Sequence, residues 1–445
     1  MKAQNNAESL AETSRRDFLK KTSTAVVGGT LLSGLSIERV AHAAGDDTLR
    51  IALIGCGGRG SGAADQALST TGNTKLVAMA DAFADRLDDS LKNLKNQHAE
   101  KVQVADDKRF VGFEAYKEAI ALADVVILAT PPGFRPIHFE EAIRQGKHVF
   151  MEKPVATDAL GVRRVLAAAE EAKKKNLKVG VGLQRHHQVG YLETLKRLHD
   201  GAIGDINAMR CYWNGTTPWV HPRAELEKHH GRKLTEMEYQ MRNWYYFVWL
   251  CGDHIVEQHI HNLDVINWVK QGHPVRAQGM GGVEVRKGPD YGEIFDHHAV
   301  EFEYADGSRC FSYCRHINGC WDSVSEYAIG TKGSVDISGH TIRGENAWRF
   351  KGGGKNPYQQ EHDDLFDAIR NNKPYNEAEN GAHSTMTAIF GRMANYSGKM
   401  IEWDEAINSK ISVMPKHFAF DAEPPVKPRP DGWYDHAVPG KTVVI

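Results

Sequence analysis

The sequence predicts an α/β protein in which a doubly wound parallel sheet precedes an α+β domain with a large, mainly antiparallel open sheet. Between residues 49 and 182, short β-branched runs alternate with helical segments, as they do in parallel sheets. Beyond residue 185 the predicted strands are longer and more aromatic, and turn sequences separate them. A chain of 445 residues is too long for one ordinary core, so we expect two domains, residues 44–185 and 186–400.

The first domain is expected to contain six strands joined by helices. The helix predicted over 158–175 begins at Asp158, whose carboxylate can accept hydrogen bonds from the first helical turn. A second helix, over 136–145, is closed by Gly146. The predicted strands are 49–54, 75–80, 102–104, 124–129, 148–151 and 178–182.

The second domain is expected to combine a sheet with helices, and a tail is expected to follow it. Residues 401–445 contain a proline-rich stretch that predicts an extended C-terminal tail. The predicted strands are 207–213, 297–304, 310–314 and 326–330, and the predicted helices are 253–270, 361–371 and 384–397.

The first 43 residues differ in character from the rest of the chain. Residues 14–20 read Ser-Arg-Arg-Asp-Phe-Leu-Lys, a mildly apolar run follows over 24–37, and residues 41–43 read Ala-His-Ala. Together these features resemble a twin-arginine (Tat) export signal, which the Tat translocon recognises on proteins that are already folded. We therefore expect a periplasmic or otherwise exported protein from which residues 1–43 are removed.

Overall composition argues against several classes of partner. The 55 Lys and Arg residues nearly balance 57 Asp and Glu residues, so the basic surface of a nucleic-acid-binding protein is not expected. No run of about 20 apolar residues predicts a membrane span. The six cysteines include no C-x-x-C pair and predict no disulfide framework, and we do not expect a bridge within the cluster of Cys310, Cys314 and Cys320. A neutral small molecule is the expected ligand.

A glycine-rich loop directly after the first predicted strand indicates a dinucleotide site of the Rossmann type. Glycines in a G-x-G-x-x-G loop let backbone N–H groups approach a pyrophosphate at the start of a helix. Asp81 ends the second predicted strand, where a carboxylate can bind both ribose hydroxyls and would repel a 2′-phosphate. We expect NAD, with NADP less favoured, although Arg86 keeps NADP open. The loop residues are Gly55, Gly57, Gly58, Arg59 and Gly60.

Two further motifs follow the fourth and fifth predicted strands, at the sheet edge where ligands bind. They are Ala129-Thr130-Pro131-Pro132 and Glu152-Lys153-Pro154. With the glycine loop and Asp81, these motifs resemble the Gfo/Idh/MocA family, named for glucose-fructose oxidoreductase and inositol dehydrogenase. The resemblance extends from residue 49 to about residue 400. It implies that Thr130, Pro131, Pro132 and Glu152 border the cofactor and that Lys153 lies beside the nicotinamide and the reacting hydroxyl.

The family also carries an aspartate followed four residues later by a histidine that serves as proton acceptor. The resemblance places His261 at this histidine and Glu257 at the aspartate, so the carboxylate arm is longer here. Their spacing would keep both on one face of a helix. His254, Glu257 and His261 could instead hold zinc, but their spacing matches neither common zinc-protease pattern, and we expect no metal.

Candidate substrate-binding residues are polar or aromatic side chains near the same cleft. Arg185 and His186 follow the sixth predicted strand, Trp213 offers a surface for stacking a sugar ring, and His254 and His259 could donate hydrogen bonds. The expected substrate is therefore a carbohydrate or polyol.

Export constrains the chemistry, because no free pool of NAD is expected outside the cytoplasm. The cofactor should be tightly bound and should be recycled within one active site. One hypothesis is hydride transfer between a sugar or polyol hydroxyl and NAD, with a second carbonyl compound as acceptor. The alternative is a redox-neutral glycosidase that acts through a transient 3-keto intermediate. A non-catalytic sugar sensor is less favoured, because both Lys153 and His261 are present.

The protein is also expected to assemble. Members of the resembling family associate through the open face of the second sheet, and strands 207–213 and 326–330 are apolar on both faces. We expect a homodimer or homotetramer.

Overall fold

The computed structural model describes residues 47–445. The proposed Tat signal, residues 1–43, lies outside this range. Among the described residues, no helix combines the length and the hydropathy that crossing a membrane requires.

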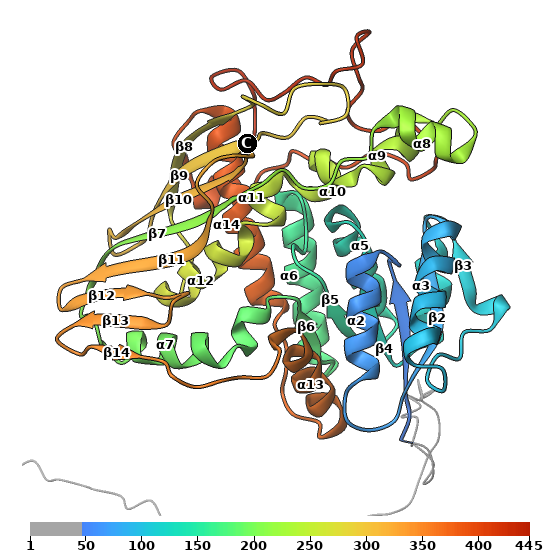
Figure 1. Ribbon diagram of the computed structural model, residues 1–445, viewed down its shortest axis with the longest axis horizontal. Helices are drawn as coiled ribbons and strands as arrows, with labels where there is room; N and C mark the ends of the chain where they lie inside the picture. Colours follow the sequence, from blue (N-terminus) through green and yellow to red (C-terminus); the bar gives the residue numbers. More distant parts are fainter. Residues whose placement is uncertain (1–46) are drawn as a thin grey trace, which may run out of the picture. The chain divides into compact units, whose positions relative to one another are not determined.

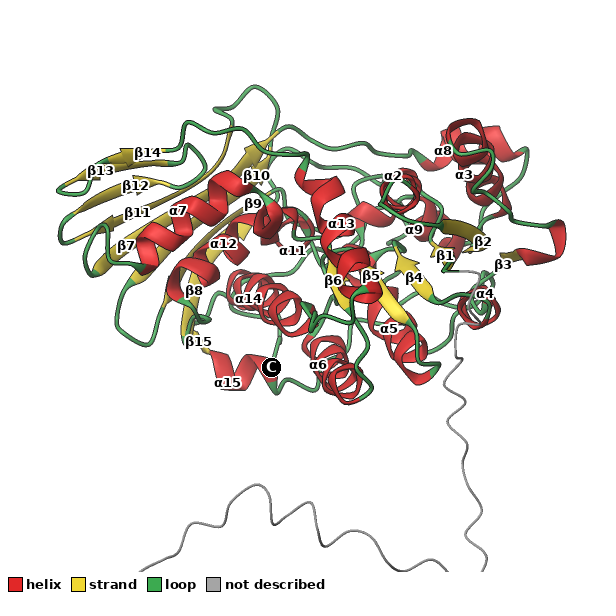
Figure 2. Cartoon of the chain, turned by 90° about the horizontal axis from the view of Figure 1, so that it is seen from below, coloured by secondary structure: helices red, strands yellow, loops and turns green. Residues whose placement is uncertain are grey.

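The first sheet has six strands, all parallel, in the order β3-β2-β1-β4-β5-β6. The strands are β1 Leu49–Ile54, β2 Thr74–Asp81, β3 Arg109–Val111, β4 Val125–Leu128, β5 His148–Met151 and β6 Val179–Val181. Helices cover both faces (Figure 2). They are α2 Gly58–Leu68, α3 Ala84–Gln97 and α13 Pro357–Arg370 on one face, and α4 Ala115–Ala121, α5 Arg135–Arg144 and α6 Ala159–Lys174 on the other. The predicted doubly wound sheet is confirmed.

Alternating side chains of the strands fill the cores on both faces of this sheet. Ile51 and Leu53 pack with α2 and α3, whereas Ala52 and Ile54 face α4 and α5. All four side chains are buried, as expected for a parallel strand covered by helices on both sides. The predicted helix start at Asp158 is also confirmed, because its side chain accepts a hydrogen bond of 2.7 Å from the Gly161 N–H.

The predicted third strand was wrong. Val102 makes only a single bridge to Leu76, and the chain then turns through a short 3₁₀ helix, Asp106–Lys108. The strand that completes the sheet is β3, which pairs with the last three residues of β2. Both segments lie at the edge of the sheet, where few contacts distinguish one short β-branched run from another.

The second sheet has nine strands in the order β14-β13-β12-β11-β7-β10-β9-β8-β15. Only β7 and β10 pair in parallel; every other neighbouring pair is antiparallel, so the predicted mainly antiparallel sheet is confirmed. The strands are β7 Ile206–Gly215, β8 Arg276–Gly282, β9 His297–Glu303, β10 Arg309–His316, β11 Ser323–Gly330, β12 Gly333–Asp336, β13 Thr341–Gly344, β14 Trp348–Arg349 and β15 Ile401–Glu402.

Helices pack on one face of this sheet, as Figure 2 shows. Along β10, Cys310, Ser312 and Cys314 point into the core, whereas Phe311 and Tyr313 point outward and are 37% and 40% exposed. The helices on the covered face are α7 Val189–His199, α11 His254–Glu257, α12 Ile260–Lys270 and α14 Ala378–Ser397.

The long helix predicted over 253–270 is interrupted. It is divided into α11 and α12 by a break at Gln258 and His259. Asp253, just before α11, has a φ of +76° and a ψ of 159°, a conformation that is essentially confined to glycine. The helical pattern that looks continuous in the sequence over 253–270 therefore corresponds to two separate helices, α11 and α12.

Two other segments depart from the expected architecture. The predicted tail begins with β15, which joins the second sheet beside β8, and with α15 Trp403–Ile407. Only from residue 408 is it irregular, as a proline-rich segment should be. Between β7 and α11 the chain forms three short helices that the sequence did not predict: α8 Arg223–His230, α9 Glu236–Arg242 and α10 Val248–Cys251.

Candidate active site

The glycine loop is shaped by two close approaches of backbone to backbone. Gly55 has a φ of +94°, and a Cβ there would lie 2.4 Å from the Thr130 nitrogen. A Cβ on Gly60 would lie 1.9 Å from the Gly55 carbonyl oxygen. These positions therefore require glycine, and they hold the start of α2 against the loop that follows β4.

Gly57 and Gly58 play a different role, because a Cβ at either position would meet no atom within 4 Å. They face open space at the start of α2, whose first-turn N–H groups have no side-chain cap. Such N–H groups, together with the helix dipole, suit a negatively charged pyrophosphate. The residues present thus fit a dinucleotide.

One cavity of about 740 Å³ contains this loop and extends to β7, α11 and α12, the elements that carry Trp213, Glu257 and His261. The three predicted catalytic residues, Lys153, Glu257 and His261, line it, and so do Arg185 and Trp213 from the predicted substrate set. Every predicted cofactor residue lines it as well: Gly55, Gly57, Gly58, Arg59, Gly60, Asp81, Arg86, Thr130, Pro131, Pro132, Glu152 and Lys153.

Asp81 is tied into the glycine loop as well as facing the cavity. Its carboxylate accepts hydrogen bonds from the N–H groups of Cys56, at 2.7 Å, and Phe83, at 2.9 Å. Burial raises the pKa of this carboxyl, and the hydrogen bonds and the charge of Arg86 oppose the rise. The carboxylate is therefore positioned before any ligand arrives.

Lys153, which follows β5, and Glu257, on α11, are joined at the cavity wall. The Lys153 ammonium donates to the Glu257 carbonyl oxygen at 2.5 Å and to its carboxylate Oε1 at 3.0 Å. Both side chains are nearly buried, at 12% and 10% exposure, and Glu257 Oε2 has no hydrogen-bond partner within residues 47–445. Charge-assisted hydrogen bonds of this kind hold the ammonium in one place.

His261 presents a desolvated imidazole to the same cavity. Its ring stacks on Trp213, with centroids 5.8 Å apart and planes inclined by 23°. Burial lowers its pKa well below the ordinary value of 6.5, and the positive charges of Lys153 and Arg185 lower it further. The imidazole is therefore neutral at neutral pH and can accept a proton.

Glu257 and His261 both reach the cavity, as expected, but the prediction that they share one face of a helix was wrong. They lie on α11 and α12, on opposite sides of the helix break, and not on one face of a single helix. The break lets the end of one helix and the start of the next face the same space.

Sequence reasoning missed the buried partner of Arg185. Glu326, on β11, is fully buried and forms an ion pair with Arg185. It also accepts hydrogen bonds from Asn262 at 2.5 Å and from the Tyr191 hydroxyl at 3.1 Å. Glu326 thereby fixes both Arg185 and the residue next to His261. The sequence signal was only a lone acidic residue within an otherwise uncharged strand.

Three predicted substrate residues lie outside the lining of the cavity, which corrects their assignment. His186 contacts Asp264 at 2.8 Å and stacks on Trp268. His254 is fully buried and donates to the Phe295 carbonyl oxygen, and His259 contacts the Ser312 hydroxyl at 2.7 Å. Each of the three rings contacts a different residue of the core, and none of the three lines the cavity.

The trio of possible metal ligands considered from the sequence does not form one cluster. Within residues 47–445, the group with ligand atoms all within 4.8 Å is Asp253, His254 and His298. The Asp253 carboxylate already accepts hydrogen bonds from the Phe295 N–H, at 3.0 Å, and the Tyr396 hydroxyl, at 2.6 Å. This cluster is a hydrogen-bonded part of the core.

Comparison with known proteins identifies the class of the first domain. Residues 49–182 match the family model GFO_IDH_MocA, described as "Oxidoreductase family, NAD-binding Rossmann fold". This part of the chain is therefore similar to the NAD-binding Rossmann domains of that oxidoreductase family.

Individual relatives extend the comparison. Inositol 2-dehydrogenase of Agrobacterium fabrum (strain C58 / ATCC 33970) is 36% identical over 182 residues, which are 40% of this chain and 50% of that protein. The chain thus spans about half the length of this curated relative.

Solved structures show that the fold as a whole is shared. Aldose-aldose oxidoreductase from Caulobacter crescentus, complexed with glycerol, has a TM-score of 0.62 and 19% identity, covering 80% of this chain and 99% of that one. Scyllo-inositol dehydrogenase from Lactobacillus casei, with bound NAD(H) and scyllo-inositol, has a TM-score of 0.59 and 21% identity, with coverage of 80% and 99%. At such identities the likeness concerns the fold alone.

Proposed function

We propose that this protein is an exported oxidoreductase that transfers hydride between a hydroxyl of a sugar, glycoside or polyol and a tightly held nicotinamide dinucleotide. The observation that carries this proposal is that Lys153, Glu257 and His261 converge on the cavity that contains the glycine loop. The inositol 2-dehydrogenase relative supports a polyol or carbohydrate substrate.

The cofactor end of the cavity favours NAD over NADP. The first turn of α2 would hold the pyrophosphate, and the positioned carboxylate of Asp81 would accept the ribose hydroxyls. A 2′-phosphate would meet this carboxylate at close range, and Arg86 is the cation that could offset the repulsion.

The reaction itself rests on proton movement by the chain. When bound, the nicotinamide supplies the hydride acceptor or donor. In oxidation, His261 accepts the hydroxyl proton while Lys153 donates a hydrogen bond to the same oxygen as the carbonyl forms. Glu257 keeps the Lys153 ammonium at the wall of the cavity, and Arg185 and Trp213 offer polar and stacking contacts to a sugar ring.

The pH dependence of oxidation should reflect the desolvated imidazole. Because neutral His261 is the working form and its pKa lies well below 6.5, kcat/KM should stay nearly constant as the pH falls from about 8 to about 6. Initial rates across this range, with circular dichroism to verify the fold, provide the measurement. A loss of half the activity centred near pH 6.5 would contradict this role for His261.

The function is tested on the purified, mature protein. Mass spectrometry of the released ligand should find NAD, and sugars and polyols added one at a time should reduce it, as followed by the absorbance of the reduced nicotinamide. A second carbonyl compound should then reoxidise it. Release of a chromogenic aglycone without lasting reduction would replace oxidoreduction by the redox-neutral glycosidase, and absence of any bound or bindable dinucleotide would refute both.

The exposed face of the second sheet supports assembly into a homodimer or homotetramer. Phe311, Tyr313 and Ile329 point outward from β10 and β11, and Ile329 is 53% exposed. Light scattering at micromolar concentration should therefore give more than one protomer, and Ile329→Glu should lower the mass. Val111→Glu is the matched control, since Val111 is also β-branched and 53% exposed but lies on the first sheet. A monomeric parent protein would contradict the expectation.

A further inference from the structure

The segment that follows β7 contributes to the wall of the cavity. We call residues 216–247 the cap; in Figure 1 its helices α8 and α9 lie above α2 and α3. Five residues of the cap line the same cavity as Asp81 and Arg86, which belong to the part of the chain that carries the glycine loop. The five cap residues are Trp219, His221, Met241, Arg242 and Trp244.

Arg242 joins the cap to the chain just beyond Asp81. Its guanidinium lies over the Phe83 ring, 4.0 Å from the centroid, and pairs with Asp85 at 3.0 Å. Burial raises the pKa of Asp85, but the hydrogen bond and charge of Arg242 outweigh it and hold that pKa below its ordinary value. Glu238, one turn earlier in α9, contacts Arg242 at 3.3 Å and orients it.

A second segment packs behind this wall. We call residues 412–434 the strap; it belongs to the irregular C-terminal stretch, drawn in dark red beside α8 and α9 in Figure 1. Phe420 stacks on Phe83, with ring centroids 5.3 Å apart, and its ring centroid lies 4.9 Å from that of Phe113. Phe418 contacts Phe134 at 5.3 Å. The three rings that receive the strap follow β2, β3 and β4 and line the cavity.

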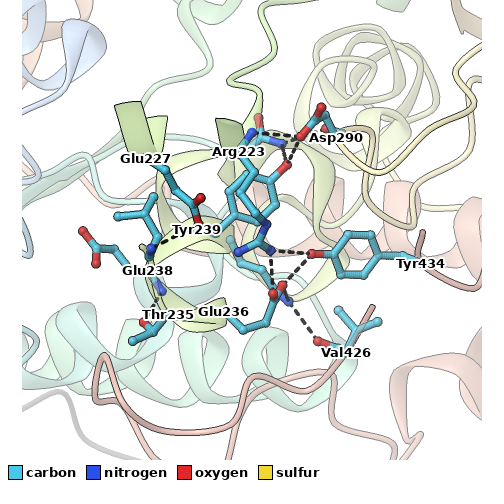
Figure 3. A network of polar contacts seen from close by, with 12 residues as sticks. Arg223, Glu227, Thr235, Glu236, Glu238, Tyr239, Asp290, Val426 and Tyr434 are labelled. Carbon is cyan, nitrogen blue, oxygen red and sulfur yellow. Dashed lines mark hydrogen bonds and ion pairs between the residues drawn. The ribbon is translucent and has the colours of Figure 1, made fainter. Parts of the chain in front are cut away.

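Polar contacts fasten the strap to the cap, as Figure 3 shows. The buried Tyr434 hydroxyl donates to Glu236 at 2.5 Å, and Arg223 contacts both Glu236, at 2.5 Å, and the Tyr434 oxygen, at 3.3 Å. The Gln240 side chain donates to the Val426 carbonyl oxygen at 2.8 Å. These part-buried hydrogen bonds join the cap to the strap.

We propose that the cap and the strap form the outer wall of the adenosine subsite and hold the nicotinamide adenine dinucleotide captive between turnovers. The inference rests on the proposed function, which places the ribose at Asp81. Arg242 and the strap residue Phe420 both contact Phe83, two positions beyond that carboxylate. The dinucleotide leaves only when Arg242 separates from Phe83 and Asp85, so these contacts set its dissociation rate.

The experiment measures release of the dinucleotide and not catalysis. Full-length mature protein is loaded with NAD, an excess of an unrelated NAD-consuming enzyme traps what is released, and the dissociation rate is followed. Arg242→Ala should accelerate release about tenfold or more, and Tyr434→Phe, which removes a single hydroxyl, by about three- to tenfold, since most affinity changes appear in the dissociation rate. Arg144→Ala is the control, because Arg144 is 69% exposed, pairs with Glu141 within α5, and lies outside the cap, the strap and the lining of the cavity.

The results distinguish failure of the proposed wall from failure of the proposed function. If Arg242→Ala does not fold, as judged by circular dichroism, Arg242→Lys keeps the charge near Asp85, loses the flat stacking on Phe83 and should still accelerate release. Release at the parent rate in both the Tyr434 and the Arg242 variants would overturn the captive wall while leaving the proposed function intact. A parent protein that binds no dinucleotide by calorimetry would overturn the proposed function itself.

Discussion

Replacing Lys153 or His261 by alanine should slow hydride transfer by about two orders of magnitude or more while the dinucleotide stays bound. Lys153→Ala removes the only ammonium that contacts Glu257 in the described structure, and His261→Ala removes the neutral imidazole beside Trp213. Neither side chain belongs to the glycine loop. Single-turnover absorbance measures the chemical step, and calorimetry measures cofactor binding.

Two substitutions at similar side chains far from the cavity serve as controls. Lys108→Ala alters a half-buried residue and His199→Ala an exposed one; both lie outside its lining, and both variants should leave the rate unchanged. Near-normal turnover in both the Lys153 and the His261 variants would refute the catalytic assignment, although the dinucleotide fold would stand. A loss of NAD binding in either variant would instead indicate a structural role.

Replacing both Arg15 and Arg16 by lysine should leave the protein in the cytoplasm, because the Tat machinery recognises the arginine pair. Both positions lie outside the described residues. Cell fractionation followed by detection of the mature chain gives the result. The control is a lysine substitution at Arg109, a residue of β3. Unchanged export of the double variant would remove the basis for an exported function.

The parts of the fold that the sequence predicted are those set by local pattern. The strands β1, β4 and β5 are short β-branched runs, and each is followed by a motif. The loops that carry these motifs meet because parallel strands end at one edge of a sheet. For the same reason, Gly55 and Thr130 could be expected to lie together. The edge strand could not be predicted, since Val102 and Arg109–Val111 differ little in local preference.

The errors at the site arose from contacts between residues distant in sequence. Glu326 lies 141 positions from Arg185, and no local pattern joins them. His254 and His259 resembled functional groups because histidines are dense in that stretch. Their partners are distant in sequence, since Phe295 lies just before β9 and Ser312 lies on β10. The cap escaped prediction because its helices are short and their stability depends on the strap that packs behind them.

The strand β11 carries functionally relevant side chains on both faces of the second sheet. Glu326 points to the covered side and holds Arg185 at the cavity, whereas its neighbour Tyr327 points to the open side, beside Tyr212 and under Arg210. One residue step thus separates the expected subunit contact from the substrate pocket. An engineered monomer would have to preserve the position of β11 to keep Arg185 in place at the cavity. Because Glu326 and Tyr327 are adjacent residues, a shift of the strand caused by loss of the subunit contact would also change catalytic efficiency.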